Sequence, residues 1–466
     1  MVRHSLLVSA LVLLGATLSD AAPSVVSRRD VPQEGVSQAI SRRGAAAAAD
    51  PERIHAWANA QRTHLRRKYA LDDAADEVQS RDTAGAATLA NVQSDSSWTA
   101  TFSVGSNAQQ VPLVLDTGSA DIWIASGARS PYSPSSSSSF TNASTAFDIT
   151  YGSGAVDGYL VRDTMSVAGK TASSQTFALA TAVTAGLLNS EISGIAGLGF
   201  QSLSTSQSPP LWSNVGLTSG AEEFAFFLNR QIQTATTSSD LEQYGGVFTL
   251  GGANSTLYQG AINWSNVINK AYWLITLGGV SVSSRSAASP TALDVSSTNK
   301  AAIDTGTTLI GGPSSVISAL YAQIPGAQAS ASSQGYYEFP CDTAVNTTMT
   351  FGDQQYAINT QDFVAGATNR AGTTCMGAFF DVGSDANTRS LQWIVGDAFL
   401  KGVYSVFQNG SPARVGFAAL ADGLNSGTSS TTVAQTKAAT SGAAAFSSGC
   451  VAVGLAAVVT SALLLA

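Results

Sequence analysis

From about residue 95 onward, the chain consists of short apolar or alternating runs that are separated by glycines. This pattern predicts β-strands, and helical periodicity is sparse in the same region. Examples are "SSWTATFSVG", "QQVPLVLDTG" and "GGVFTLGG", followed later by "KAYWLITLGGVSV". Upstream, the stretch "DPERIHAWANAQRTHLRRKYALDDAADE" has a helical pattern, with Asp50 as a candidate N-cap and Pro51 at the first helical position. The pattern therefore predicts an all-β body preceded by a helical leader.

The first 21 residues have the pattern of a secretory signal peptide. Arg3 and His4 precede an apolar run, and small residues allow cleavage after about Ala21. An N-terminal membrane anchor is the alternative, but the apolar run is short for a membrane span. We therefore expect the chain to enter the secretory pathway. Four sequons for N-glycosylation agree with that expectation, at Asn142, Asn254, Asn263 and Asn346.

The other end of the chain resembles a signal for a glycolipid (GPI) anchor. A stalk rich in Ser and Thr, 422–448, is followed by an apolar tail, 449–466, with no charged residue after it. Ser441 and Gly442 are the candidate attachment residues, and the tail would be removed. A transmembrane helix is the alternative, although the tail is short and lacks a basic stop. The predicted location is extracellular or at the outer cell surface, with membrane contact only through the lipid anchor.

Composition and charge narrow the classes of function that the chain can have. The chain has 466 residues, enough for two or three domains, and is 44% hydrophobic and 12% charged, with a net charge of −8. This balance argues against a nucleic-acid-binding surface. Residues 22–81 differ, because there Lys and Arg outnumber Asp and Glu. A basic leader on an acidic body suggests a propeptide that ends between about 69 and 95; a solvated extension is the alternative.

The positions of histidine and cysteine exclude several kinds of catalysis. The three histidines, His4, His55 and His64, all lie in the signal or the leader. The body therefore cannot contain a Ser-His-Asp triad, a Cys-His pair or a histidine-ligated zinc site. Cys341 and Cys375 are its two cysteines outside the tail, and an even pair in a secreted chain predicts a disulfide. We expect no metal and no cofactor.

An internal repeat supplies the candidate chemistry. An Asp-Thr-Gly triplet follows an apolar strand twice, 188 residues apart, and each triplet is followed by a hydroxyl residue. Each copy also has a downstream element of two apolar residues and a glycine, "GIAGLGF" at 194–200 and "WIVGDAFL" at 393–400. This order indicates duplication of a whole domain. The candidate site residues are Asp116, Thr117, Gly118 and Ser119 in the first copy and Asp304, Thr305, Gly306 and Thr307 in the second.

Two such aspartates could hydrolyse an amide without histidine. If Asp116 and Asp304 come into contact, both cannot stay ionised, and they share one proton. The ionised carboxylate can then take a proton from water, while the protonated one polarises a peptide carbonyl. Glycine permits the close approach, and the hydroxyl residues hold the carboxylates. A single Asp-Thr-Gly would instead indicate an ordinary Asx turn, so the argument depends on the repeat.

Between about residues 50 and 421, the chain resembles the pepsin-like aspartic proteases and looks like a fungal secreted member. The motifs that carry the resemblance are "VLDTGSADIWI", "YGSGAVDGYL", "GIAGLG", "AIDTGTTLI" and "WIVGDAFLKGVYSVF". The resemblance implies an all-β, bilobal fold with lobes at 96–268 and 269–421 and a cleft between them. It implies an aspartic endopeptidase that is made as a zymogen, works as a monomer and cleaves peptides or proteins at acid pH, with a carboxylate pair like that of pepsin.

The resemblance also implies individual roles. Tyr151, Gly152 and Ser153 would lie on a flap that closes over substrate, although plain strand packing is the alternative for the tyrosine. Lys68 would lie over the aspartates in the zymogen, and the cysteine pair matches a second-lobe disulfide. The chain departs from the family by lacking a first-lobe cysteine pair. A catalytically silent binding or inhibitory protein is the competing reading, and a carboxylate-based metal hydrolase is a third.

Overall fold

The computed structural model describes most of the chain between residues 51 and 424. The described residues are 51–68, 84–92, 95–127, 130–151, 154–185, 187–188, 191–217, 222–230, 242–284, 289–383 and 391–424. The predicted signal peptide, stalk and apolar tail lie outside them, as does most of the predicted propeptide. We call the described residues between 84 and 424 the β body.

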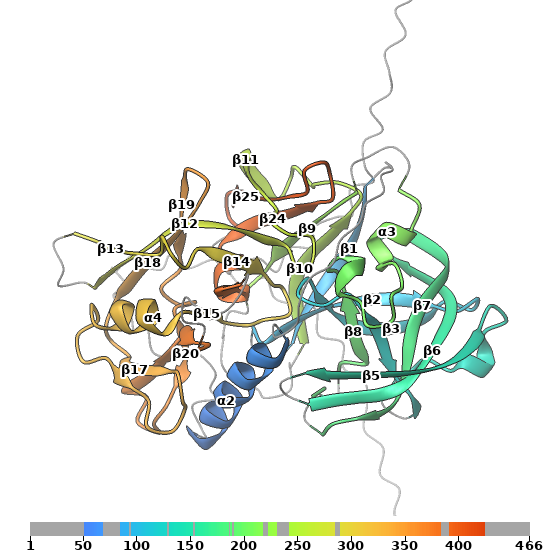
Figure 1. Cartoon of the computed structure of the whole chain (residues 1–466), viewed down its shortest axis with the longest axis horizontal. Helices are drawn as coiled ribbons and strands as arrows, with labels where there is room; N and C mark the ends of the chain where they lie inside the picture. The colour runs from blue at the N-terminus through green and yellow to red at the C-terminus, as the bar shows by residue number, and fades with distance from the viewer. Residues whose placement is uncertain are drawn as a thin grey trace, which may run out of the picture. The chain divides into compact units, whose positions relative to one another are not determined.

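Strands dominate the β body, as the alternating and apolar runs predict, and most belong to one large sheet (Figure 1). Its thirteen strands have the order β11-β25-β24-β9-β10-β1-β2-β3-β8-β4-β7-β6-β5. Their bounds are β1 Gly85–Val92, β2 Ser97–Val104, β3 Gln109–Asp116, β4 Ile122–Ala125, β5 Thr141–Tyr151, β6 Gly154–Val167, β7 Lys170–Val183, β8 Gly194–Gly197, β9 Glu223–Leu228, β10 Glu242–Leu250, β11 Tyr258–Asn266, β24 Val403–Gln408 and β25 Arg414–Leu420.

Two smaller sheets belong to the second half of the chain. An eight-stranded sheet has the order β19-β18-β12-β14-β23-β15-β22, with β13 paired to β12, and a four-stranded sheet has the order β16-β17-β21-β20. Their bounds are β12 Leu274–Ser284, β13 Thr291–Leu293, β14 Lys300–Ile303, β15 Ile310–Gly312, β16 Gln328–Ala329, β17 Tyr337–Pro340, β18 Val345–Phe351, β19 Gln354–Ile358, β20 Val364–Ala367, β21 Thr374–Gly377, β22 Phe379–Asp381 and β23 Trp393–Val395.

The described helices are few and mostly short. They are α2 Pro51–Lys68, α3 Leu211–Asn214, α4 Ser314–Tyr321 and α5 Asp397–Leu400, with 3-10 turns at Pro134–Ser136 and Gln201–Leu203. The leader helix α2 begins at Pro51, as predicted, because the fixed φ of proline suits the first helical position. Ile54, Ala58 and Leu65 form its buried face, which packs into the main core.

The two halves of the chain are built on the same pattern of strands. In the first half, β8 pairs in parallel with β3 and antiparallel with β4, and β4 pairs in parallel with β7. In the second, β23 pairs in parallel with β14 and antiparallel with β15, and β15 pairs in parallel with β22. The order β3-β8-β4-β7 therefore repeats as β14-β23-β15-β22. The all-β fold with two duplicated lobes is confirmed.

The large sheet also joins the two halves. Strand β24, from the end of the body, pairs with β9, which comes from the first half, and β25 pairs with the other edge of β24 (Figure 1). Strand β1 pairs with β2 and β10, so the sheet extends upstream of residue 96, where we expected the first lobe to begin. Buried aromatic rings fill the join: Phe224 stacks on Phe407, and the Trp273 indole donates a 2.9 Å hydrogen bond to the Leu198 carbonyl.

Candidate active site

Both Asp-Thr-Gly triplets lie at the carboxyl ends of strands in this repeated pattern. Asp116 is the last residue of β3 and pairs in register with Gly197 of β8. Asp304 follows β14 directly, and its backbone N–H donates a 3.0 Å hydrogen bond to the Val395 carbonyl of β23. The predicted downstream elements therefore pack beside their own triplets. Each aspartate emerges from a buried strand that is hydrogen-bonded on both sides, which gives it a rigid support.

The two triplets are tied to each other by reciprocal hydrogen bonds. The backbone N–H of Thr117 donates to Thr305 Oγ1 at 3.1 Å, and that of Thr305 donates to Thr117 Oγ1 at 3.0 Å. Each hydroxyl then donates across to the opposite strand at 2.8 Å, Thr117 Oγ1 to the Ile303 carbonyl and Thr305 Oγ1 to the Leu115 carbonyl. All four bonds are buried, where hydrogen bonds are strong and an unmade one is costly. The triplets are therefore fixed side by side.

Each carboxylate is also held by its own turn. For Asp116, Oδ1 accepts the Gly118 N–H at 2.9 Å and Oδ2 accepts the Ser119 hydroxyl at 2.5 Å. The second copy repeats these contacts, because Gly306 N–H donates to Asp304 Oδ1 at 2.9 Å and Thr307 Oγ1 donates to Oδ2 at 2.5 Å. In both copies, therefore, the glycine of the triplet and the hydroxyl residue after it hold the two oxygens of the carboxylate.

The glycine of the second triplet lies against the aspartate of the first. A methyl group added at Gly306 would lie 2.3 Å from Asp116 Oδ1, closer than real side-chain contacts allow. Only a glycine fits at this position. Its lack of a side chain lets the carboxylate of Asp116 approach the Asp-Thr-Gly turn of the second copy. Asp116 is 3% exposed and Asp304 is fully buried. Two carboxyl groups in such a site favour a single shared negative charge over two.

A third buried acid, Asp397, lies close to the pair and was not singled out from the sequence. It begins α5, directly after Gly396 of the second downstream element, and its N–H donates to the Thr307 carbonyl at 2.8 Å. In the first copy, the strand register places Leu198 at the position of Asp397, and the bond to the Ser119 carbonyl comes from the next residue, Gly199. Burial raises the pKa of Asp397 well above its ordinary value, and nearby Asp304 and Asp116 raise it further, while Lys401 opposes the shift.

A buried network of charges extends from this acid. The Lys401 ammonium lies 2.9 Å from an Asp95 oxygen and 2.8 Å from an Asp362 oxygen, and Arg230 Nε donates to Asp362 at 2.6 Å. The sequence signal that could have found it is "GDAFLK", an acid and a lysine four residues apart after a buried strand. The network joins residues from the first, middle and last parts of the β body.

The disulfide between Cys341 and Cys375 is confirmed, with their Cα atoms 5.0 Å apart. It links the end of β17 to β21 within the four-stranded sheet, which contains neither of the strands that lead to the aspartates. Neither cysteine is therefore available as a nucleophile. Among the described residues, no group of three or more His, Cys, Asp or Glu side chains is arranged to hold a metal ion.

Other predicted residues are placed only in part. Tyr151 ends β5, and Phe147 of the same strand belongs to a small apolar cluster that also contains Trp123 of β4. The side chain of Tyr151 lies outside the described residues, as do Gly152 and Ser153. Lys68 is the last residue of α2, and its side chain also lies outside them. The anchor candidates, Ser441 and Gly442, are likewise outside.

The four sequons differ in their surroundings. Asn142 and Asn346 are exposed, whereas Asn254 and Asn263 are half-buried. The side-chain nitrogen of Asn263, the atom that a glycan would need, donates a 2.9 Å hydrogen bond to the Phe351 carbonyl. A glycan at Asn263 would therefore break a contact within the body, and the exposed sequons are the better candidates.

Residues 97–420 match the family model of the eukaryotic aspartyl protease. The chain belongs to the eukaryotic aspartyl protease family. Its relatives include major aspartyl peptidase 1 of Cryptococcus neoformans var. grubii, 37% identical over 401 residues, or 79% of this chain and 81% of the relative. An aspartic protease of Phaffia rhodozyma is 35% identical, over 77% of this chain and 85% of the relative. Pepsin A of Sus scrofa is 30% identical, over 70% of this chain and 82% of the relative.

Membership of this family confirms the recognition that the motifs suggested. The chain is an aspartic-type endopeptidase, a hydrolase of peptide bonds whose substrates are peptides or proteins. The competing reading as a silent binding protein finds no support in the site, because both triplets and their hydrogen bonds are intact.

Proposed function

We propose that Asp116 and Asp304 are the catalytic pair of this aspartic endopeptidase. The observation that carries the proposal is the reciprocal bonding of Thr117 and Thr305, which locks the two triplets together. The pair shares one proton in acid solution. The ionised carboxylate takes a proton from a water molecule as that water attacks the peptide carbonyl, and the protonated carboxyl donates a hydrogen bond to the carbonyl oxygen.

The supporting residues act by fixing the oxygens of the pair. Ser119 and Thr307 each donate to the outer oxygen, and the glycine N–H groups of the turns donate to the other. Because these donors are already in place, little reorganisation is needed as charge moves during the reaction. Tyr151, Gly152 and Ser153, at the turn between β5 and β6, are proposed to close over a bound peptide.

The test is cleavage of a fluorogenic peptide at acid pH by processed protein. Asp116→Asn and Asp304→Asn should each reduce kcat by at least about a thousandfold, since each removes one member of the proton-sharing pair. Asp353→Asn, which changes an exposed carboxylate in the turn after β18, is the matched control and should keep the wild-type rate. Substantial turnover by either variant of the pair would contradict the assignment.

The leader is proposed to keep the enzyme inactive as a zymogen, with residues 22–81 as the propeptide and Lys68 near the aspartates. Helix α2 supports this, because it contacts both β5, next to the proposed flap, and β20 of the second half. A helix held against both would hinder entry of an extended peptide. Cleavage of the chain between Lys68 and the start of β1 would remove α2 and leave β1 paired with β10 in the large sheet. The test is N-terminal sequencing of the mature protein.

The remaining proposals concern location. Residues 1–21 would direct secretion, and the tail would be exchanged for a lipid at Ser441 or Gly442, leaving a monomer on the outer cell surface with glycans on its exposed sequons. Among the described helices, none is long and apolar enough to cross a membrane. Treating intact cells with a phosphatidylinositol-specific phospholipase should release the activity, and activity that stays on the cells would contradict the anchor.

A further inference from the structure

Another buried acid follows the first triplet, at a position that the proposed mechanism does not use. Asp121 lies five residues after Asp116 and is 3% exposed. Its carbonyl accepts the Gly197 N–H at 3.0 Å. In the second copy, the Leu309 carbonyl accepts the Gly396 N–H at 3.1 Å in the same way, so Leu309 occupies the matching position. The repeat is therefore broken here, because one copy has a carboxylate where the other has an apolar core side chain.

The carboxylate of Asp121 binds the segment that follows β8, residues 198–206, which we call the bridge segment. Oδ1 accepts the Ser204 hydroxyl at 2.8 Å and the Ser206 N–H at 3.0 Å. Oδ2 accepts the Thr205 N–H at 2.7 Å. Hydrogen bonds to a buried group are strong, and leaving such donors without a partner is costly. One side chain therefore fixes the end of the bridge segment.

The beginning of the bridge segment holds the turn of Asp116. Leu198 N–H donates to the Asp116 carbonyl at 2.7 Å, and Gly199 N–H donates to the Ser119 carbonyl, also at 2.7 Å. These two carbonyls belong to the residues whose side chains meet, since the Ser119 hydroxyl donates to Asp116 Oδ2. A methyl group added at Gly199 would lie 2.9 Å from the Ser119 carbonyl oxygen, so the two backbones are in close contact. A shift of the bridge segment would therefore move the carboxylate of Asp116.

The middle of the bridge segment reaches the second half of the body. Ser202 Oγ donates a 2.7 Å hydrogen bond to the Lys270 carbonyl, shortly before β12. Leu203 packs against a small buried cluster that contains Ala302. Ala302 lies in β14, two residues before Asp304. The bridge segment therefore contacts the first catalytic turn at its beginning and the strand of the second aspartate further along.

The second copy places its buried acid differently. The register puts Asp397, the first residue of α5, at the position of Leu198. At the two matching positions, each copy therefore has one buried acid and one leucine, in exchanged order. The backbone bonds of α5 help to hold the second segment. The bridge segment has a single 3-10 turn in its place, so it depends more on its bonds to Asp121.

We propose that Asp121 is a positioning residue for the catalytic pair, because it holds the bridge segment that in turn fixes the turn of Asp116. This inference rests on the proposed function only in treating Asp116 as a member of the pair. Asp121 acts through the backbone of the bridge segment and does not itself take part in the reaction. Its loss should therefore lower kcat and change KM little, because a displaced carboxylate impairs the chemical step more than the binding of the peptide.

The test measures kcat and KM of processed protein for a fluorogenic peptide at acid pH, with a thermal unfolding midpoint on each sample. Asp121→Asn keeps one acceptor oxygen, but its NH2 group cannot accept the remaining N–H. It should lower kcat about tenfold and leave KM within about twofold. Asp121→Leu, which introduces the residue type of the second copy, removes all three bonds and should lower kcat about a hundredfold.

Asp163→Asn is the matched control, because it changes another buried acid that organises a loop. Asp163 is 1% exposed, and its carboxylate accepts three hydroxyl groups of the loop before β5, those of Tyr132, Ser137 and Ser139. The substitution should lower the unfolding midpoint and leave kcat unchanged, because these bonds belong to a different loop. Equal losses of kcat in Asp121→Asn and Asp163→Asn would indicate a general effect of stability and would overturn the inference.

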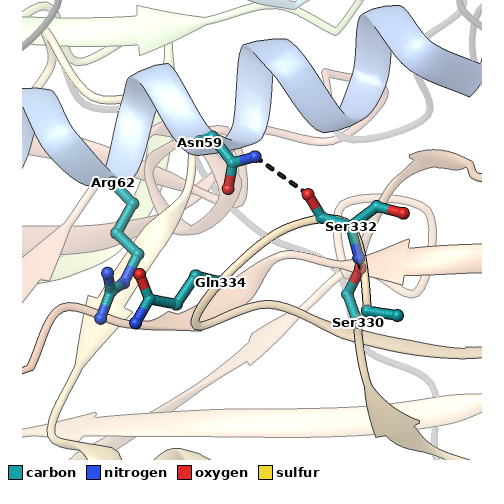
Figure 2. A pocket seen from close by; sticks show the side chains of 6 residues that line it. Asn59, Arg62, Ser330, Ser332 and Gln334 are labelled. Carbon is teal, nitrogen blue, oxygen red and sulfur yellow. Dashed lines mark hydrogen bonds between the residues drawn. The ribbon is translucent and has the colours of Figure 1, made fainter.

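Ser204→Ala removes only one of the three bonds to Asp121, so its kcat should fall about two- to threefold. Its control is Ser332→Ala, at an exposed serine beside a pocket of about 480 Å³ (Figure 2). The loop of Ser332 contacts the leader helix α2, from which Asn59 donates a 3.0 Å hydrogen bond to the Ser332 carbonyl. Processed Ser332→Ala enzyme should therefore keep the wild-type kcat. A Ser204→Ala rate equal to that of Ser332→Ala would contradict the role given to the hydroxyl bond.

Gly199→Ala tests the same contact from the other side, since its methyl group would press on the Ser119 carbonyl. It should lower kcat about tenfold with KM unchanged. Combined with Asp121→Asn, it should cost less than the product of the two losses, because both act through one segment. Losses that multiply in full, or wild-type kcat in both Asp121 variants, would overturn the inference. If Asp121→Leu does not fold, Asp121→Asn and Gly199→Ala decide. Failure of the catalytic assignment shows separately, as turnover by Asp116→Asn.

Discussion

The contact between Gly306 and Asp116 makes a quantitative prediction about catalysis. In a Gly306→Ala variant, the new methyl carbon would lie 2.3 Å from Asp116 Oδ1 and 2.5 Å from Cγ. An ordinary contact needs about 3.4 Å, so the carboxylate has to move by about 1 Å. That movement would break its bonds to the Gly118 N–H and the Ser119 hydroxyl. A misplacement of about 1 Å costs roughly a hundredfold in rate.

The assay is kcat/KM for a fluorogenic peptide at acid pH, with a thermal unfolding midpoint measured on the same sample. Gly279→Ala is the matched control, because its methyl group would lie 3.6 Å from the nearest atom, Thr350 Oγ1. We expect Gly306→Ala to lose about a hundredfold and Gly279→Ala to stay within about twofold. If the Gly306 variant keeps more than a third of the wild-type rate while folding normally, the geometric argument is wrong.

Three further predictions concern stability. The raised pKa of Asp397 means that folding is favoured in acid, where the carboxyl group is protonated, and that this stabilisation is lost as the pH rises above about 4. Asp397→Asn removes the ionisation and should therefore stabilise the protein above about pH 4, by up to about 1.4 kcal/mol per pH unit. Thermal unfolding midpoints of the variant and the wild type at pH 3 and pH 7 test this, and an equal change of midpoint at both pH values would refute it. Thr117→Val should cost about 2–4 kcal/mol, because a buried N–H and a buried carbonyl lose their partner, while Thr117→Ser should recover most of it in urea unfolding. Replacing Cys341 and Cys375 together by alanine should cost about 2–5 kcal/mol in the same assay but leave kcat unchanged, because the disulfide belongs to a sheet that contains neither of the strands that lead to the aspartates.

Much of the fold could be predicted because its signals are local. Alternating apolar runs bounded by glycines indicate strands, and Pro51 marks the start of a helix, since both depend on neighbouring residues. The repeated triplets and their downstream elements indicated a duplication, and the strand pairing reproduces it. The cysteine pair was predictable by elimination, because the third cysteine lies in the tail.

Other features could not be predicted because they depend on which strands meet. Nothing in the local pattern of β24 and β25 indicates that they extend a sheet begun by the first half of the body. The charge network of Arg230, Asp362, Lys401 and Asp95 combines residues up to 306 positions apart. A sequence shows these residues as isolated charges, and only their burial together shows that they are paired.

The sequence by itself determined which residues could do chemistry: two aspartates in matching triplets, and no histidine beyond residue 64 to compete with them. The tertiary structure decided how they are held. The exchange of hydrogen bonds between Thr117 and Thr305 spans 188 positions, and the closeness of Gly306 to Asp116 follows from it. The physical reason is that strand propensity and composition act over a few residues, whereas the geometry of a carboxylate pair depends on contacts between segments that meet only after the chain has folded.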